Sequence, residues 1–202
     1  KPRRLGCLNM ANEKLYPAMD TLIGEICDVF KSSPYFHIGA DEAWLARVSK
    51  TPEAQAYYKE FDLDGAHGMY CHFIIRMNEI VKKHGKQTIV WEGFRGSGSR
   101  NAQIPKDIIV MPFENAYNPS PSLAKHGYTM INTAWCPLYV VNASRQSPEH
   151  IYKWNKYEFG TGRVYERARW FRLKPTPLII GAQMCAWEQP GWKEIPSLRS
   201  RL

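Results

Sequence analysis

The chain contains no apolar run close to the roughly 20 residues of a membrane-spanning helix, so no membrane span is expected. Its first residues, Lys1 to Arg4, also lack an initiating Met and the apolar stretch of a signal peptide. We therefore expect a processed chain or part of a longer one. The sequence leaves its compartment undetermined.

Cysteine is sparse and forms no recognisable pattern. The five cysteines are odd in number and far apart, with no C-x-x-C pair and no Cys/His ligand spacing. Cys27, Cys136 and Cys185 have apolar neighbours, which is typical of buried thiols. No Gly-rich phosphate loop follows any predicted strand either. We expect neither a metal nor a cofactor.

Acidic residues are fewer than basic ones, 19 against 27, which gives a net charge of +8. The basic residues are scattered and accompany no nucleic-acid-binding motif. We interpret them as solvated surface and expect no nucleic-acid partner. A basic nucleic-acid-binding α/β domain stays as the weakest hypothesis, with binding that falls steeply as salt rises.

The composition is that of a folded domain. Hydrophobic residues make up 44% and aromatic residues 13% of the 202 residues. A chain of this length can bury a core, and we expect one domain over 1–202.

Short apolar segments alternate with amphipathic ones. We expect helices at 17–31, 52–61, 65–84 and about 122–126, and a helical turn from Pro148. Strands are expected at 36–40, 88–91, 108–111, 129–134 and 178–186, and 136–176 is expected to be mostly irregular. Strands that are apolar throughout and alternate with helices indicate a parallel sheet covered on both faces. The fold class is therefore α/β.

The most informative segment is Phe36 to Trp44, in which an apolar strand ends in two small residues and the acid pair Asp41-Glu42. Adjacent carboxyl groups repel each other, which favours one protonated and one ionised acid. Glycosidic bond cleavage uses such a pair, one protonated and one ionised carboxyl group. The alternative is that Asp41 caps the next helix and Glu42 lies in its first turn.

Other reactive or aromatic side chains also follow predicted strands. These are Trp91, Glu92, Glu114, Trp135 and Trp187. Active sites of β/α barrels are built at the carboxyl ends of the strands. Because no phosphate loop is present, a barrel is preferred to a doubly wound sheet. Only five of its eight strands are visible.

Taken together, these segments resemble glycoside hydrolase family 20, the β-N-acetylhexosaminidases. The family's His-x-Gly-Gly-Asp-Glu motif is similar to 37–42, with Ala40 in place of the second Gly. Trp91, the segment 135–139 and the segment 181–187 resemble the ends of the fifth, seventh and eighth barrel strands. The resemblance implies a (β/α)8 TIM barrel of which this chain covers about strands 4 to 8.

The resemblance also implies a mechanism and a set of site residues. The substrate's own 2-acetamido oxygen attacks the anomeric carbon and gives an oxazolinium ion. Glu42 is then the general acid and base, and Asp41 orients the acetamido group and stabilises its positive charge. Tyr139 is expected to hydrogen-bond the acetamido oxygen. The remaining substrate-binding residues are Trp91, Trp135, Trp187 and Gln189.

Three departures from the family pattern concern sugar binding. The family's Tyr-x-Asp becomes Tyr139-Val140-Val141, its Trp-x-Glu becomes Trp187-Glu188-Gln189, and its Trp after strand six becomes Met111 or Phe113. We therefore expect the binding of the sugar's distal hydroxyl groups to differ from that in the family. Trp44, Trp154, Trp170 and Trp192 are expected to be packing or loop anchors, and His37 a hydrogen-bonded residue within the strand.

The leading hypothesis is a hydrolase of terminal β-linked N-acetylhexosamine whose partner is an oligosaccharide or glycoconjugate. The second is a non-catalytic carbohydrate-binding or structural half-barrel without activity of its own. An open half-barrel exposes sheet edges. It is thus expected to pair with the missing barrel half or with a copy of itself.

Overall fold

The computed structural model describes residues 6–141, 146–162 and 164–187. The chain forms two compact units, Lys1–Ile109 (unit 1) and Val110–Leu202 (unit 2). Strand β5 (Ile109–Met111) crosses the boundary between them. Each unit is described by itself.

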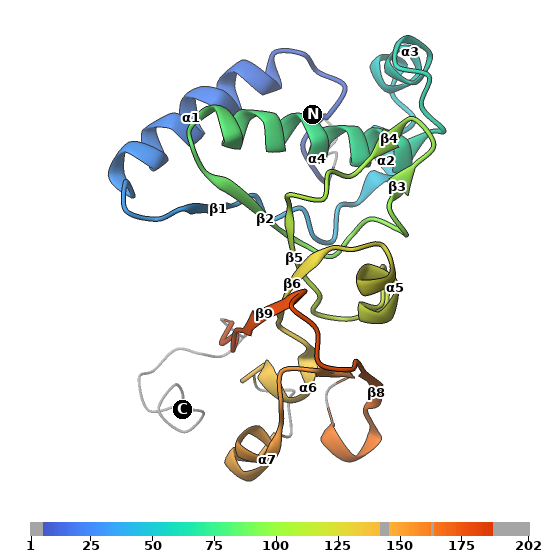
Figure 1. Cartoon of the computed structure of the whole chain (residues 1–202). Helices are drawn as coiled ribbons and strands as arrows, with labels where there is room; N and C mark the ends of the chain where they lie inside the picture. The colour runs from blue at the N-terminus through green and yellow to red at the C-terminus, as the bar shows by residue number, and fades with distance from the viewer. Residues whose placement is uncertain (1–5, 142–145, 163, 188–202) are drawn as a thin grey trace, which may run out of the picture. The chain divides into compact units, whose positions relative to one another are not determined.

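Unit 1 is built on two helices and a parallel strand pair. Helices α1 (Leu15–Val29) and α4 (Ala66–Lys83) pack side by side (Figure 1). Strand β1 (Tyr35–His37) pairs in parallel with β2 (Gln87–Trp91), and Phe36 lies opposite Thr88. Smaller elements complete the unit: α2 (Leu45–Val48), α3 (Pro52–Glu60) and the antiparallel pair β3 (Gly98–Ser99) and β4 (Ala102–Gln103).

The apolar spacing of α1 and α4 accounts for their packing. In α1, Ile23 and Cys27 are one helical turn apart and both are buried. In α4, Met69, Phe73 and Met77 repeat every four residues on the buried face. Gly85 follows this helix at a φ of 70°, a conformation that favours glycine and ends the helix.

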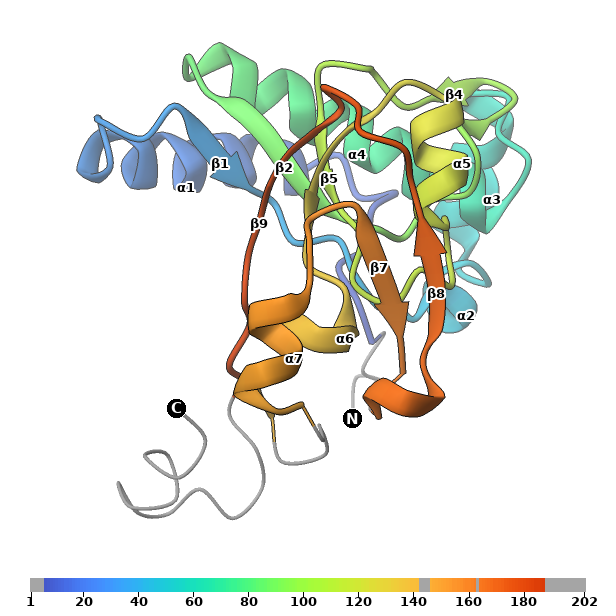
Figure 2. The ribbon, with the colours of Figure 1, turned by 60° about the horizontal axis from the view of Figure 1, so that its bottom comes forward.

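Unit 2 combines a parallel strand pair with an antiparallel hairpin. Strand β6 (Thr129–Asn132) pairs in parallel with β9 (Ile179–Ala182). Figure 2 shows β7 (Glu158–Thr161) and β8 (Arg169–Arg172) side by side, joined through the 3-10 helix η1 (Tyr165–Arg167). The helices are α5 (Ser120–Lys125), α6 (Trp135–Leu138) and α7 (Pro148–Lys153).

A buried asparagine ties the two parts of unit 2 together. The amide nitrogen of Asn132, at the end of β6, donates to the carbonyls of Lys156 (3.0 Å) and Glu158 (2.9 Å). Its amide oxygen accepts from the Ala134 N–H at 3.0 Å. Since Asn132 is fully buried and satisfied on both sides, it holds the end of β6 against the start of β7.

The predicted helices and five predicted strands are confirmed with somewhat different ends. The prediction of strands buried throughout is wrong at two places. Tyr35 and His37 lie on the same face of β1 and both are exposed, whereas Phe36 on the opposite face is partly buried, so one face of this strand is uncovered. Ile180 of β9 is also exposed. The hairpin β7–β8 lies in the segment that was expected to be irregular.

None of the helices in the described ranges is both long enough and apolar enough to cross a membrane.

Candidate functional site

The acid pair lies in a turn after β1. Both Asp41 and Glu42 are exposed. Helix α2 begins only at Leu45, its N-cap residue is Trp44, and its first turn holds no acidic residue. The interpretation of the pair as a helix cap is therefore wrong, and the two carboxylates are free of that structural role.

The backbone of this turn is strained. Gly39, Ala40 and Glu42 have φ values of 73°, 68° and 45°. Only glycine adopts this region without cost, and other residues lose about 1–2 kcal/mol each. Strain of this kind persists only where neighbouring structure imposes it, and it clusters at functional sites.

Three hydrogen bonds hold the strained turn to the rest of unit 1. The Gly39 N–H donates to Nδ1 of His37 at 2.9 Å. The Gly39 carbonyl accepts from the Trp91 N–H at 2.9 Å. The buried Tyr70 of α4 donates its hydroxyl to the Ala40 carbonyl. These contacts fix the backbone immediately before Asp41.

Gly93, two residues after β2, makes the last of these contacts possible. A Cβ atom at this position would lie 2.9 Å from the Ala40 carbonyl and would also collide with the Tyr70 hydroxyl. Only glycine leaves room for the hydrogen bond between them. The loop after β2 is thus shaped around the acid-bearing turn.

Trp91 and His37 form the aromatic side of this turn. Their ring centroids are 5.0 Å apart and Trp91 is buried. Desolvation of the imidazole lowers the pKa of His37, although part of the residue stays accessible, and the Asp41 carboxylate opposes this shift. A neutral imidazole is also what the Gly39 N–H requires, since protonated Nδ1 cannot accept a hydrogen bond. His37 is a hydrogen-bonded residue of β1, as predicted.

Acidification is expected to destabilise the chain partly through His37. Its folded pKa lies below the ordinary value of about 6.5, so the unfolded chain binds the proton first as the pH falls. Stability is lost from about pH 6.5 down to the lowered folded pKa. Denaturant unfolding at pH 7 and pH 5 measures this loss, and the His37→Gln variant should lose less. An equal loss in parent and variant contradicts the assignment.

Unit 2 carries the other predicted aromatic residues. The rings of Trp135 and Tyr139 stack, with centroids 4.4 Å apart and planes at 27°. Tyr139 is buried and pairs in a β-bridge with Cys185. Trp187 is 44% exposed, and Gln189 lies outside the described residues. Trp135 and Tyr139 are thus brought together at the end of β6.

At two of the three departures from the family pattern the residues are apolar and buried. Val141, Met111 and Phe113 are all buried. None of these side chains can hydrogen-bond a sugar hydroxyl. A hollow of about 210 Å³ in the same unit is instead lined by Glu114, Ala116, Trp135 and Gly162. Glu114 follows a predicted strand but is not among the site residues that the sequence predicts.

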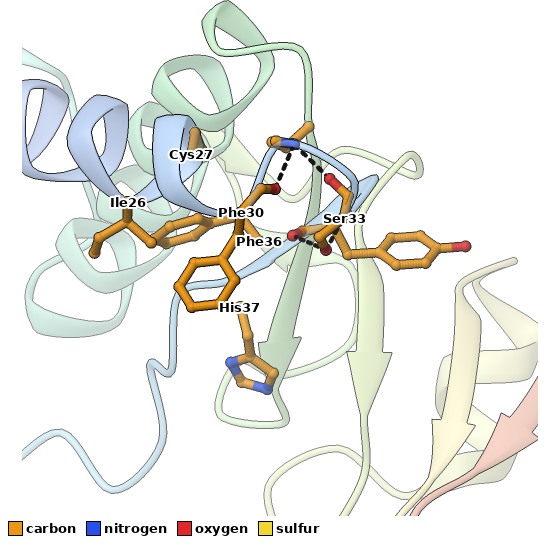
Figure 3. Close-up of a pocket in the computed structure, with 8 residues that line it drawn as sticks. Ile26, Cys27, Phe30, Ser33, Phe36 and His37 are labelled. Atoms are coloured by element: carbon orange, nitrogen blue, oxygen red, sulfur yellow. Dashed lines mark hydrogen bonds between the residues drawn. The ribbon is translucent and has the colours of Figure 1, made fainter.

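A second hollow, of about 280 Å³, lies in unit 1 between the end of α1 and β1 (Figure 3). Ile26, Cys27 and Phe36 line it, and His37 bounds it. Its lysine, Lys86, donates to the carbonyls of Phe30 (3.1 Å) and Lys31 (2.9 Å). With that cation satisfied, the remaining lining is mainly apolar.

Within the ranges that the structure describes, no three His, Cys, Asp or Glu side chains gather in an arrangement that could hold a metal ion.

The fold, with reactive side chains after parallel strands, is that of part of a β/α barrel. The sequence profile of the glycosyl hydrolase family 20 catalytic domain matches residues 3–190, and the chain belongs to this family. It carries part of the family's (β/α)8 barrel, about strands 4 to 8.

Individual relatives agree with this assignment. The chain is 27% identical to the Beta-hexosaminidase subunit beta of Entamoeba histolytica, over 90% of this chain and 33% of that protein. It is also 28% identical to a Beta-hexosaminidase of Porphyromonas gingivalis, over 40% of this chain and 10% of that protein. The chain thus spans about a third of the length of the first of these relatives.

Solved structures are similar in fold. The beta-N-acetylhexosaminidase of Bacteroides fragilis has a TM-score of 0.67 at 19% identity, over 91% of this chain and 39% of that chain. A GH20 exo beta-N-acetylglucosaminidase of Vibrio harveyi, solved with N-acetylglucosamine, has a TM-score of 0.65 at 19% identity, over 89% and 28%. At such low identity, the likeness establishes the fold alone.

Proposed function

We propose that the chain carries the acid pair of an exo-acting glycoside hydrolase that removes terminal β-linked N-acetylhexosamine from oligosaccharides or glycoconjugates. The observation that carries this proposal is the exposed pair Asp41-Glu42, held on a strained turn in a chain of glycosyl hydrolase family 20. Two accessible carboxylates with no capping role are what glycosidic bond cleavage requires.

The reaction proceeds in two steps. The 2-acetamido oxygen of the sugar attacks the anomeric carbon while Glu42 protonates the departing glycosidic oxygen, so that the C–O bond breaks and an oxazolinium ion forms. Glu42, now a carboxylate, takes a proton from water, which opens the oxazolinium ring and releases the sugar with its β configuration retained. Because the nucleophile belongs to the substrate, attack is intramolecular and gains several kcal/mol.

The other residues orient the acetamido group. Asp41 accepts a hydrogen bond from its N–H and stabilises the positive charge that develops there. Tyr139 donates to its oxygen, while Trp91 and Trp187 pack against its methyl group and the sugar ring. Trp135 and Gln189 bind the remaining sugar surface. No step requires a metal or a cofactor.

In the complete catalytic domain, barrel strands outside this chain pair with β1. Phe30 and Tyr35 beside the α1–β1 hollow are 62% and 43% exposed, an apolar surface that suits a further βα unit of the barrel. Light scattering of the chain, alone and mixed with the missing barrel part, tests this pairing. A stable homodimer that does not bind the missing part of the barrel contradicts this proposed pairing.

Tyr70→Phe is expected to lower kcat about tenfold and to leave KM nearly unchanged in the complete barrel. The substitution removes the hydrogen bond to the Ala40 carbonyl and loosens the turn that carries the acids. The matched control is Tyr58→Phe, because the Tyr58 hydroxyl also donates to a backbone carbonyl, that of Ser49 at 3.5 Å, but outside the acid-bearing turn. Equal kcat values for the two variants contradict the role of Tyr70.

A non-catalytic carbohydrate-binding fragment is the second candidate, favoured by the chain's spanning only 33% of its relative. Hydrolysis of an aryl β-N-acetylglucosaminide, measured for the chain alone and within the complete barrel, separates the two. Turnover by the complete barrel supports the hydrolase. A folded complete barrel without turnover, but with sugar binding, supports the second candidate.

A further inference from the structure

The hollow in unit 2 combines one carboxylate with one aromatic face. Glu114 is half-buried, and among the described residues no hydrogen bond or ion pair engages its carboxylate. The indole of Trp135 forms another wall. Ala116 and Gly162, the other described residues of the lining, are exposed, so the hollow can be reached from solvent.

Several contacts hold these walls together. The Trp135 N–H donates to the carbonyl of Phe113 at 2.9 Å, which fixes the backbone before Glu114 beside the start of α6. The Thr133 hydroxyl donates to the Pro112 carbonyl at 3.0 Å and reinforces this link. The two side chains therefore project from backbone segments that are joined directly to each other.

The third wall is fixed through Cys136. Its thiol donates to the Gly162 carbonyl at 3.2 Å, and Cys136 forms a β-bridge with Gly160. A Cβ at Gly160 would lie 2.7 Å from the Cys136 carbonyl, so only glycine allows β7 to approach this closely. Stacking on Tyr139 holds the Trp135 ring itself. The hollow is thus preformed.

The chemistry of this hollow suits a sugar. A carboxylate accepts strong hydrogen bonds from neighbouring hydroxyls, and an aromatic face packs against the C–H face of a pyranose ring. A volume of about 210 Å³ lies below the range of pockets for drug-sized ligands and suits a single ring. Among the described residues that line it, the one charged side chain is the carboxylate of Glu114, which favours a neutral hydroxyl-bearing ligand over an anion.

We infer that Glu114 and Trp135 form a hydroxyl-binding sugar subsite, in which Glu114 accepts hydrogen bonds from one or two hydroxyls of the terminal N-acetylhexosamine and Trp135 packs on its ring. This inference rests on the proposed function and makes Glu114 a determinant of which hydroxyl pattern is accepted.

The test uses Glu114→Gln and Glu114→Ala in the complete barrel, with aryl β-N-acetylglucosaminide and its 3-, 4- and 6-deoxy analogues as substrates. For the parent sugar, kcat/KM should fall about 10- to 100-fold, as expected for the loss of a hydrogen bond to a charged group. For the analogue that lacks the bound hydroxyl, kcat/KM of the same variants should be close to that of the unsubstituted enzyme. The matched control is Glu149→Gln, an exposed glutamate paired with Lys153.

Equal losses on the parent sugar and on every deoxy analogue, or no loss at all, overturn the inference. Failure of the proposed function gives a different result: either Glu42→Gln keeps full activity, or the unsubstituted complete barrel does not hydrolyse the substrate. In that case, the affinity of the chain for N-acetylglucosamine, measured by titration, tests whether the subsite binds the sugar. Binding that Glu114→Ala weakens at least tenfold supports it, and binding that is absent or unaffected by Glu114→Ala overturns it.

Discussion

Replacement of Glu42 by Gln is expected to lower kcat of the complete barrel by about 10²- to 10⁴-fold, the usual contribution of a general acid and base. Gln has nearly the same shape but cannot protonate the leaving oxygen. Glu42 is exposed and heads no helix, so the substitution should leave the free energy of unfolding almost unchanged. Steady-state hydrolysis and denaturant unfolding measure the two effects.

The leaving group sharpens this test. A dinitrophenyl leaving group departs without protonation. Glu42→Gln should therefore slow the formation of the oxazolinium ion much less with a dinitrophenyl glycoside than with an alkyl glycoside. Glu25→Gln, at an exposed position on α1, is the matched control and should behave as the parent does. The assignment of Glu42 fails if the variant loses equally with both leaving groups.

Replacement of Asp41 by Asn is expected to lower kcat by about 10²- to 10³-fold, as the removal of one preorganised electrostatic contact does. The neutral amide no longer stabilises the charge on the acetamido group. A thiazoline analogue of the oxazolinium ion should bind more weakly to the variant by a similar factor. Unchanged kcat together with unchanged binding of the analogue contradicts the role of Asp41.

A second readout of Asp41→Asn does not depend on activity. The Asp41 carboxylate raises the pKa of His37 against the larger effect of desolvation. Its removal should lower the pKa of His37 further, which NMR titration of the imidazole can follow. This shift establishes that the variant keeps the turn in place while its charge is gone.

Hydrophobic periodicity was sufficient to predict most elements of this chain. Helix α4 shows why: the buried residues Met69, Phe73 and Met77 recur every four positions, and Gly85 ends the helix. The exposure of Tyr35 and His37 was not predictable, because the sequence pattern of this short strand does not show whether both of its faces are covered. The β7–β8 hairpin was missed since Glu158, Arg169 and Arg172 conceal the alternation that indicates strands.

Some residues of the candidate site could be predicted from the sequence and others could not, for a related reason. Asp41-Glu42 is an adjacent pair after a strand, so the sequence shows it directly. Only the structure excludes its capping role, since the helix begins three residues after Glu42. Glu114 is a single acid after a strand and has no spacing signal. The role inferred for it depends on Trp135 and Gly162, which the fold brings to the same hollow.

The most direct test of the account compares two substrates that differ only at the sugar's second carbon, an aryl β-N-acetylglucosaminide and the corresponding aryl β-glucoside. If the substrate supplies the nucleophile, the complete barrel should hydrolyse the acetamido sugar at least about a thousandfold faster, because the glucoside cannot make the intramolecular attack. Comparable kcat/KM values for the two substrates would contradict the proposed roles of both Asp41 and the acetamido group.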